Sequence, residues 1–157
     1  MNVTVAALPA AFLDRVRNEG IDDLGQPVKR VIAEGGEPCR DVLRRAKPGE
    51  ELILASFSPF SRVGPYREFG PVFVLAQPSA EEVARNAFPE TGGERYLREQ
   101  FVIRAYSPNE EIVDAAMTTS AKANETVERL LAREDTAFLH VRFPTYGCFA
   151  LRVDRAS

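Results

Sequence analysis

Residues 51–76 read ELILASFSPFSRVGPYREFGPVFVLA, and this stretch decides the fold. Apolar runs stand at both of its ends, at 52–55 and at 72–76. Residues that are apolar at successive positions, rather than at alternate ones, are typical of strands covered on both faces. The stretch therefore predicts two strands at the middle of a sheet, joined by the loop 58–71.

The loop 58–71 is dense in residues that fix a backbone or make contacts. It carries two Gly-Pro pairs, two arginines and three aromatic residues. A loop of this length in a compact domain is often functional. Arg62, Tyr66 and Arg67 are suited to clamp a carboxylate or phosphate. Alternatively, Glu68 and the loop carbonyls use up the same donors.

Length and composition bound the class of protein. A chain of 157 residues predicts one domain, spanning 1–157. Hydrophobic residues make up 45% of the chain and charged residues 27%, which is ordinary for a soluble globular protein. The net charge of -3 argues against a nucleic-acid partner. No apolar run reaches the roughly 20 residues that cross a bilayer, so no membrane partner is expected.

The rest of the chain predicts an α+β fold. Strand pairs joined by loops favour this class over a doubly wound sheet. We expect one central, mostly antiparallel sheet of about six or seven strands with two or three helices packed on it. Candidate strands lie at 3–8, 28–33, 52–55, 72–76, 101–106, 112–117 and in a final hairpin over 136–154. Helical patterns lie at 10–17, 38–45, 78–87 and, most clearly, 121–133.

The final hairpin has a predicted register. A three-residue turn, 145–147, with Gly147 in the left-handed conformation places Phe143 opposite Phe149. Six apolar side chains then share one face, and a slip by one residue would mix the two faces. These six are Leu139, Val141, Phe143, Phe149, Leu151 and Val153.

Several short motifs together resemble a known family. They are Pro38-Cys39-Arg40, 70–74 (GPVFV), 139–142 (LHVR) and 146–149 (YGCF). From about Val28 to Arg155 the chain resembles the bacterial domain of unknown function numbered 1203. The resemblance implies a single small domain, and it implies no activity and no catalytic residues.

The usual cofactor and metal motifs are absent from the sequence. There is no glycine-rich nucleotide loop, no His-Glu-x-x-His and no Cys-x-x-Cys. We therefore expect no cofactor and no metal site. Cys39 and Cys148 are far apart and no export signal is seen, so both are expected as reduced thiols in the cytoplasm.

Two residues are weak catalytic candidates, and whether the protein is an enzyme stays undecided. Cys39 begins the predicted helix 38–45 beside Arg40, where the helix dipole and the cation would lower its pKa. With His140 as base and an acid such as Asp41 to orient it, Cys39 would be a nucleophile. The alternatives are a small buried Cys39 and a structural His140.

The polar face of the hairpin is the second candidate site. Alternation places His140 and Arg142 on one face, and the register brings Arg152 opposite His140. The arginines would keep His140 neutral at pH 7, which suits an anion or carboxylate site. The alternative is a network of arginines and carboxylates. The predicted ligand-binding residues are Arg40, Tyr66, Arg67, His140, Arg142 and Arg152.

Two functional hypotheses follow. The first is a protein, or an enzyme, that binds a small anionic ligand in a pocket lined by arginine and histidine. The second is a non-enzymatic interaction module, whose loop aromatics Phe60, Tyr66 and Phe69 dock a partner protein or a second copy of the chain. A closed pocket that holds Arg and His side chains favours the first, and an exposed apolar loop favours the second.

Overall fold

A computed structural model describes residues 2–157, which divide into two compact units. The first unit comprises residues 2–6, Phe60–Arg67 and Ala84–Ser157. The second comprises Ala7–Pro59 and Glu68–Val83. Each unit contains its own five-stranded sheet. The prediction of a single domain over 1–157 stays a prediction.

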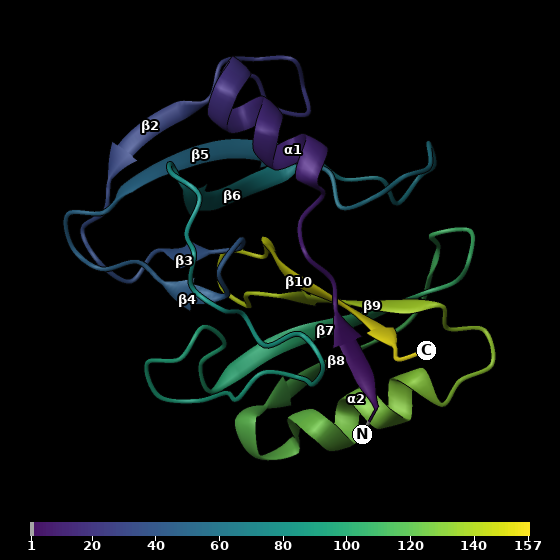
Figure 1. The fold of residues 1–157 in the computed structure, drawn as a ribbon. Helices are drawn as coiled ribbons and strands as arrows, with labels where there is room; N and C mark the ends of the chain where they lie inside the picture. The colour runs from purple at the N-terminus through teal and green to yellow at the C-terminus, as the bar shows by residue number, and fades with distance from the viewer. Residues whose placement is uncertain (1) are drawn as a thin grey trace. The chain divides into compact units, whose positions relative to one another are not determined.

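The first unit is built on an antiparallel sheet with the strand order β1-β10-β9-β7-β8 (Figure 1). Its central strand is β9, which pairs with both β10 and β7. The strands are β1 (Val3–Val5), β7 (Gln100–Tyr106), β8 (Ile112–Thr119), β9 (Phe138–Arg142) and β10 (Phe149–Arg155).

One face of this sheet packs against helix α2 (Ala123–Leu131), which follows the 3-10 turn η2 (Ser120–Lys122) (Figure 1). Val127 and Leu130 of α2 are fully buried, and the Thr118 and Thr126 hydroxyls form a 2.8 Å hydrogen bond between β8 and the helix. The sequence predicted this helix within 121–133. The buried side chains of this face include Phe101, Ile103, Ala105, Leu139, Val141, Leu151 and Val153.

The hairpin of β9 and β10 has the predicted register along most of its length. Val141 faces Leu151 and His140 faces Arg152, and Gly147 has the predicted left-handed φ of 73°. Near the turn the prediction is wrong. The Phe143 N–H donates to Cys148 O at 3.1 Å, and Phe149 lies opposite Arg142.

A β-bulge between Phe149 and Leu151 is the reason for the difference. The bulge inserts an extra residue into β10, so the turn runs over 144–147 rather than over three residues. Phe149 therefore leaves the apolar face. Its ring contacts His140 on the opposite face of the sheet, with centroids 5.2 Å apart.

The second unit has the strand order β2-β5-β6-β3-β4, with β3 parallel to β6 and the other pairs antiparallel. As predicted from residues 51–76, β5 and β6 lie inside this sheet. Leu52 and Ile53 are neighbours on β5, and both are fully buried. The strands are β2 (Lys29–Ile32), β3 (Pro38–Cys39), β4 (Arg44–Arg45), β5 (Glu51–Phe57) and β6 (Gly70–Leu75).

Helix α1 (Ala10–Asp14) continues into the π-turn η1 (Arg15–Glu19) in this unit. Phe12 and Val16 are buried on the predicted apolar side, and the Phe12 ring packs on Phe57 at 4.7 Å between centroids. Gly20 ends the element at φ 69°, as the sequence predicted. The helical prediction over 10–17 is therefore confirmed in position, with a wider last turn.

The helix predicted at 38–45 is wrong. Cys39 pairs in parallel with Phe73 of β6, and the Arg40 N–H donates to Phe73 O at 2.9 Å. A single helical turn, from Leu43 N–H to Cys39 O, ends because Leu43 has a φ of 51°. Backbone pairing with β6 thus outweighs the local helical pattern, and β3 and β4 form instead.

The helix predicted at 78–87 is also wrong, since this segment contains neither helix nor strand. Most of its side chains are exposed, so it has no apolar stripe to bury. The segment instead contacts β1 through its backbone, since the Arg85 carbonyl accepts the N–H of Val5 at 2.8 Å.

The predicted fold class holds in its coarse form and fails in its sheet count. The fold is α+β and mostly antiparallel, but its strands form two sheets of five rather than one of six or seven. The strands β5 and β6 pair with β2 and β3 rather than with any strand of the hairpin's sheet, so the strands divide into two sheets. The segment 38–45, predicted as a helix, supplies β3 and β4 to the sheet of β5 and β6, while β1 joins the sheet of the hairpin.

Candidate functional site

The face of the first unit's sheet that lies opposite α2 carries a buried histidine at its centre. Alternation along β9 places Phe138, His140 and Arg142 on this face. His140 is fully buried, and its cross-strand neighbours are Arg104 on β7 and Arg152 on β10. Three arginines therefore lie around one imidazole.

Four aromatic rings surround the His140 imidazole. One of them, Phe60, belongs to the loop that follows β5, whereas the others stand on strands. The distances from the imidazole centroid are 4.8 Å to Tyr106, 5.1 Å to Phe60, 5.1 Å to Phe138 and 5.2 Å to Phe149. We call these four rings the aromatic cage.

Neither ring nitrogen of His140 has a hydrogen-bond partner among residues 2–157. Burial holds the pKa of His140 well below its usual value of 6.5, and the charges of Arg142, Arg152 and Arg104 lower it further. The imidazole is therefore neutral at pH 7, as the sequence predicted, and it offers one donor and one acceptor.

The arginines of this face differ in their partners. Arg152 is paired with Asp154 at 2.7 Å, and its guanidinium carbon lies 3.9 Å from the centre of the Phe138 ring. Arg142 is 6% exposed, and its Nη1 donates to Gly147 O at 3.3 Å. The charge of Arg152 is thus answered by an internal carboxylate, as the network alternative expects for this residue.

The Tyr106 hydroxyl is a second buried polar group in the cage. It is fully buried and has no hydrogen-bond partner in the part of the chain that the structure describes. By contrast, the buried Tyr96 hydroxyl donates to Ala150 O at 2.7 Å. Most buried polar groups in proteins are hydrogen-bonded. The His140 imidazole and the Tyr106 hydroxyl are two exceptions within one cage.

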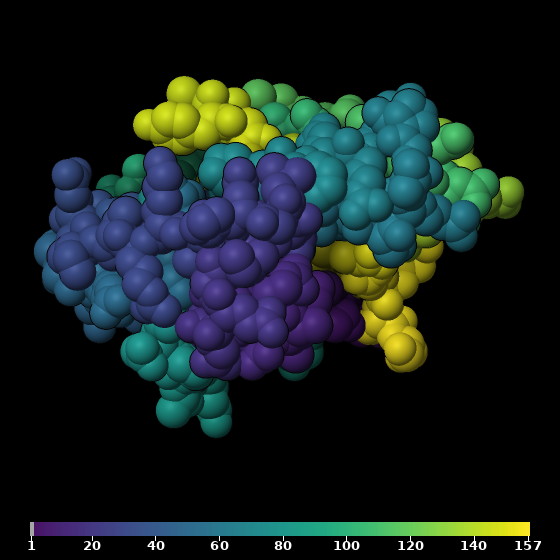
Figure 2. Space-filling view, turned by 90° about the horizontal axis from the view of Figure 1, so that it is seen from above, coloured from purple at the N-terminus to yellow at the C-terminus, as the bar shows by residue number. Residues whose placement is uncertain are grey.

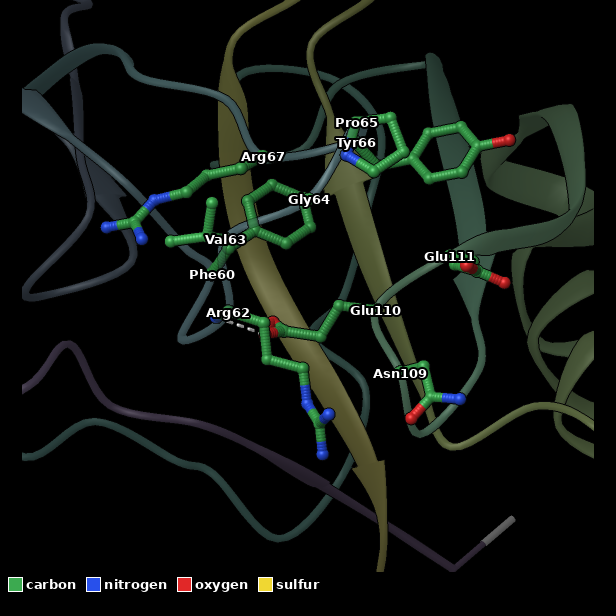
Figure 3. A pocket seen from close by; sticks show the side chains of 10 residues that line it. All are labelled: Phe60, Arg62, Val63, Gly64, Pro65, Tyr66, Arg67, Asn109, Glu110 and Glu111. Atoms are coloured by element: carbon green, nitrogen blue, oxygen red, sulfur yellow. Dashed lines mark hydrogen bonds between the residues drawn. The ribbon is translucent and has the colours of Figure 1, made fainter.

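The loop Phe60–Arg67 encloses a cavity of about 260 Å³ (Figure 3). The blue-teal atoms of this part of the chain lie at the surface in Figure 2. Phe60 lines the cavity and also belongs to the aromatic cage. The lining comprises residues 60, 62–67 and 109–111.

Glu110 ties this loop to the turn between β7 and β8. Its carboxylate accepts the Arg62 N–H at 2.7 Å (Figure 3) and the Ser61 N–H at 2.9 Å. The Ser61 hydroxyl donates to the same oxygen at 2.9 Å. Glu110 is 8% exposed and has a φ of 62°, a conformation that favours glycine.

The predicted clamp of Arg62, Tyr66 and Arg67 is not assembled in this structure. The two guanidinium groups point away from each other, and the Tyr66 ring points to a third side (Figure 3). All three residues nevertheless border the same cavity. The loop thus supplies two cations and an aromatic ring to one rim.

Cys39 and Arg40, the other predicted site residues, belong to the second unit. Burial raises the pKa of Cys39 to about 12, which agrees with the alternative of a small buried cysteine, and a catalytic role of Cys39 with His140 stays a hypothesis. The helix expected to lower this pKa does not form. Arg40 is 2% exposed and its Nη1 donates to Pro38 O at 2.7 Å.

Other features bear on what the protein could bind. Both cysteines carry thiols rather than a disulfide, as predicted. Within residues 2–157 no three His, Cys, Asp or Glu side chains gather closely enough to hold a metal ion. No helix in the described chain is long and apolar enough to cross a bilayer.

Sequence reasoning missed the residues that enclose His140. Alternation on β7 puts Arg104 and Tyr106 on one face, and that signal was sufficient to predict them as neighbours of His140 once β7 was paired with β9. Nothing in the sequence marks Glu110 as the residue that holds the loop. Phe60 was identified as a loop aromatic but not as a cage member.

The fold and site define a small α+β protein with a neutral histidine enclosed at the centre of a sheet face. The chain belongs to the family described as Protein of unknown function (DUF1203), whose model matches residues 36–155. The resemblance seen in the sequence is thereby confirmed. No curated protein and no solved structure matches the chain.

Proposed function

We propose that this protein binds a small anionic molecule on the face of the first unit that holds His140. The observation that carries the proposal is the state of His140, which is fully buried with both ring nitrogens unpartnered among residues 2–157. A buried polar group without a partner costs stability. A ligand that hydrogen-bonds the imidazole would remove that cost.

The charges around the imidazole support an anion as the ligand. Arg104, Arg142 and Arg152 all act on His140 with the same sign, and Asp154 is paired with Arg152. A neutral imidazole does not add to this positive charge, yet it still donates a hydrogen bond. A carboxylate or phosphate would meet both the positive field and a donor.

The cavity beside the cage supports a ligand with a planar apolar part. Phe60 and Tyr66 contribute aromatic surface to it, while Arg62 and Arg67 contribute charge. Ligand sites commonly combine apolar walls with a few placed polar groups. We therefore expect an aromatic carboxylate such as benzoate to bind more tightly than acetate.

Thermal unfolding in the presence of anions tests this proposal. Phosphate, sulfate, acetate and benzoate are compared at constant ionic strength, and a ligand should raise the Tm by mass action. Arg142→Gln should abolish the shift. Arg129→Gln is the matched control, since Arg129 is a half-exposed arginine of the same unit that is paired with Asp114 at 3.6 Å. An unmoved wild-type Tm with all four anions contradicts the proposal.

A second candidate is association of the chain with itself or with a partner protein through the loop. Val63 at the loop tip is 91% exposed, and Tyr66 is 39% exposed. Sedimentation velocity across a range of concentrations tests self-association. If the loop is the contact, Val63→Asp should make a wild-type oligomer monomeric. A wild type that is monomeric at every concentration removes the self-association form of this candidate.

A further inference from the structure

We propose that the loop Phe60–Arg67 is a gate over His140, that the Glu110 carboxylate holds it closed, and that a ligand reaches the imidazole when Phe60 swings out. This inference rests on the proposed function. It supplies the route by which an anion meets an imidazole that the protein encloses completely.

Phe60 is the cage member that no strand holds. Tyr106, Phe138 and Phe149 stand on β7, β9 and β10, where backbone ladders fix them. Phe60 stands on a loop, with its ring 5.1 Å from His140 and 5.3 Å from Tyr106. Phe60 also lines the cavity. If its ring moved away, the cavity would connect with the His140 imidazole and the Tyr106 hydroxyl.

Glu110 holds the loop where packing does not. Residues 61–66 are exposed, so little apolar burial keeps them in place. The carboxylate of Glu110 instead binds the N–H groups of Ser61 and Arg62, directly after Phe60. Hydrogen bonds to a charged acceptor are the strong ones, and these fix the position of the Phe60 backbone.

The backbone at position 110 supports a special task for this glutamate. Glu110 occupies the left-handed position of the turn that closes on Ser107, where glycine or asparagine is usual. A glutamate there is strained, and its hydrogen bonds to the loop offset the strain. The closed state is therefore strained at Glu110 and held by these hydrogen bonds. Loss of the hydrogen bonds would leave the strain without compensation and release the loop.

The charges that face the site link the gate to its ligand. His140 meets Arg104 from β7, Arg142 on its own strand and Arg152 from β10. An incoming anion is attracted by these cations and competes with the Glu110 carboxylate for the N–H donors of the loop. The class of ligand that the face attracts is thus the class that opens the gate.

His140 is the sole histidine of the chain, so its accessibility can be measured without ambiguity. Ligand-free protein is treated with diethylpyrocarbonate at pH 7, and ethoxycarbonylation of the peptide that contains His140 is followed by mass spectrometry. Glu110→Asn keeps a residue that tolerates the left-handed backbone but is too short to hold the loop. We expect it to speed labelling on the order of ten-fold or more, because charge-assisted hydrogen bonds are lost.

Glu111→Asn is the matched control, since Glu111 is the exposed neighbour that lines the same cavity. It should label at the wild-type rate. A Glu110→Asn protein that folds and labels no faster than wild type overturns the gate. If that variant does not fold, Ser61→Ala replaces it, and an unchanged labelling rate in Ser61→Ala overturns the gate as well.

The labelling experiment and the anion test check the gate and the anion binding independently. Faster labelling of Glu110→Asn with no anion-induced Tm shift in wild type supports the gate and contradicts anion binding. An anion-induced Tm shift with no effect of Glu110 on labelling contradicts the gate and leaves anion binding in place.

Discussion

The ring of Phe60 stands edge-on to the imidazole of His140, with centroids 5.1 Å apart and an interplanar angle of 67°. This contact joins a residue of a long loop to the centre of a sheet face. It replaces a hydrogen bond with a weaker polar-aromatic contact, since neither nitrogen of His140 has a partner within residues 2–157. The cage thus encloses the imidazole at the cost of leaving a buried polar group unsatisfied by the described chain.

His140→Leu should therefore stabilise the ligand-free protein. The substitution removes two buried polar atoms that lack partners in the described chain, and it introduces an apolar side chain of similar size. We expect the free energy of unfolding at pH 7.5 to rise by about 1 kcal/mol, the lower end of the cost of an unsatisfied buried group. Urea unfolding measures it, and a loss of stability would show that His140 has a structural role.

A pair of tyrosines offers a matched test of the same principle. Tyr96→Phe removes a hydroxyl that donates to Ala150 O, so it should lower the free energy of unfolding by about 1 kcal/mol. Tyr106→Phe removes a hydroxyl without a partner in the described chain, so it should leave stability unchanged or raise it. Equal losses in the two variants would contradict the assignment of Tyr106.

Gly147→Ala tests the turn between β9 and β10. The φ of Gly147 is 73°, and an added Cβ would meet nothing within 4 Å, so the cost comes from the backbone alone. We expect a loss of about 1 kcal/mol in the free energy of unfolding. Gly64→Ala is the control, since it has equally open space and no positive φ. A loss in both variants would point to loop flexibility instead.

Patterns over single elements predicted much of this fold. Leu52 and Ile53 are buried neighbours, as an apolar run predicts, and α2 buries the stripe that contains Val127. Gly147 has its predicted positive φ, because glycine adopts this conformation without steric cost. In each case a short-range rule decides the outcome.

The failures occur where distant segments decide. Cys39 lies in a strand because it pairs with Phe73, which local helix propensity cannot reveal. Phe149 lies on the opposite face from the predicted one because of a β-bulge, which the rules for turn residues do not predict. His140, Arg142 and Arg152 were predicted together because alternation and register suffice, whereas Glu110 reaches the loop from 48 residues beyond Arg62.

The two cysteines should react with thiol reagents at different rates. Burial raises the pKa of Cys39 to about 12, so at pH 8 almost none of it is thiolate. Cys148 is half-buried and should react first in the folded protein. Titration with a chromogenic disulfide, followed by peptide mass spectrometry, identifies the order. In denaturant both thiols should react, and early labelling of Cys39 would contradict its burial.

Stability should fall with acidification in a way that His140 controls. Its pKa in the folded protein lies well below the ordinary 6.5 of the unfolded chain. The unfolded chain therefore binds more protons between these two values, so the contribution of His140 is present above pH 6.5 and is lost as the pH falls.

The expected slope is up to about 1.4 kcal/mol of unfolding free energy per pH unit below pH 6.5. Because the chain has one histidine, His140→Leu should remove this component and leave the titration of the carboxylates. Urea unfolding of both proteins from pH 7.5 to pH 5 measures the difference. Parallel curves for the two proteins would mean that His140 titrates normally, and hence that the cage opens readily to water.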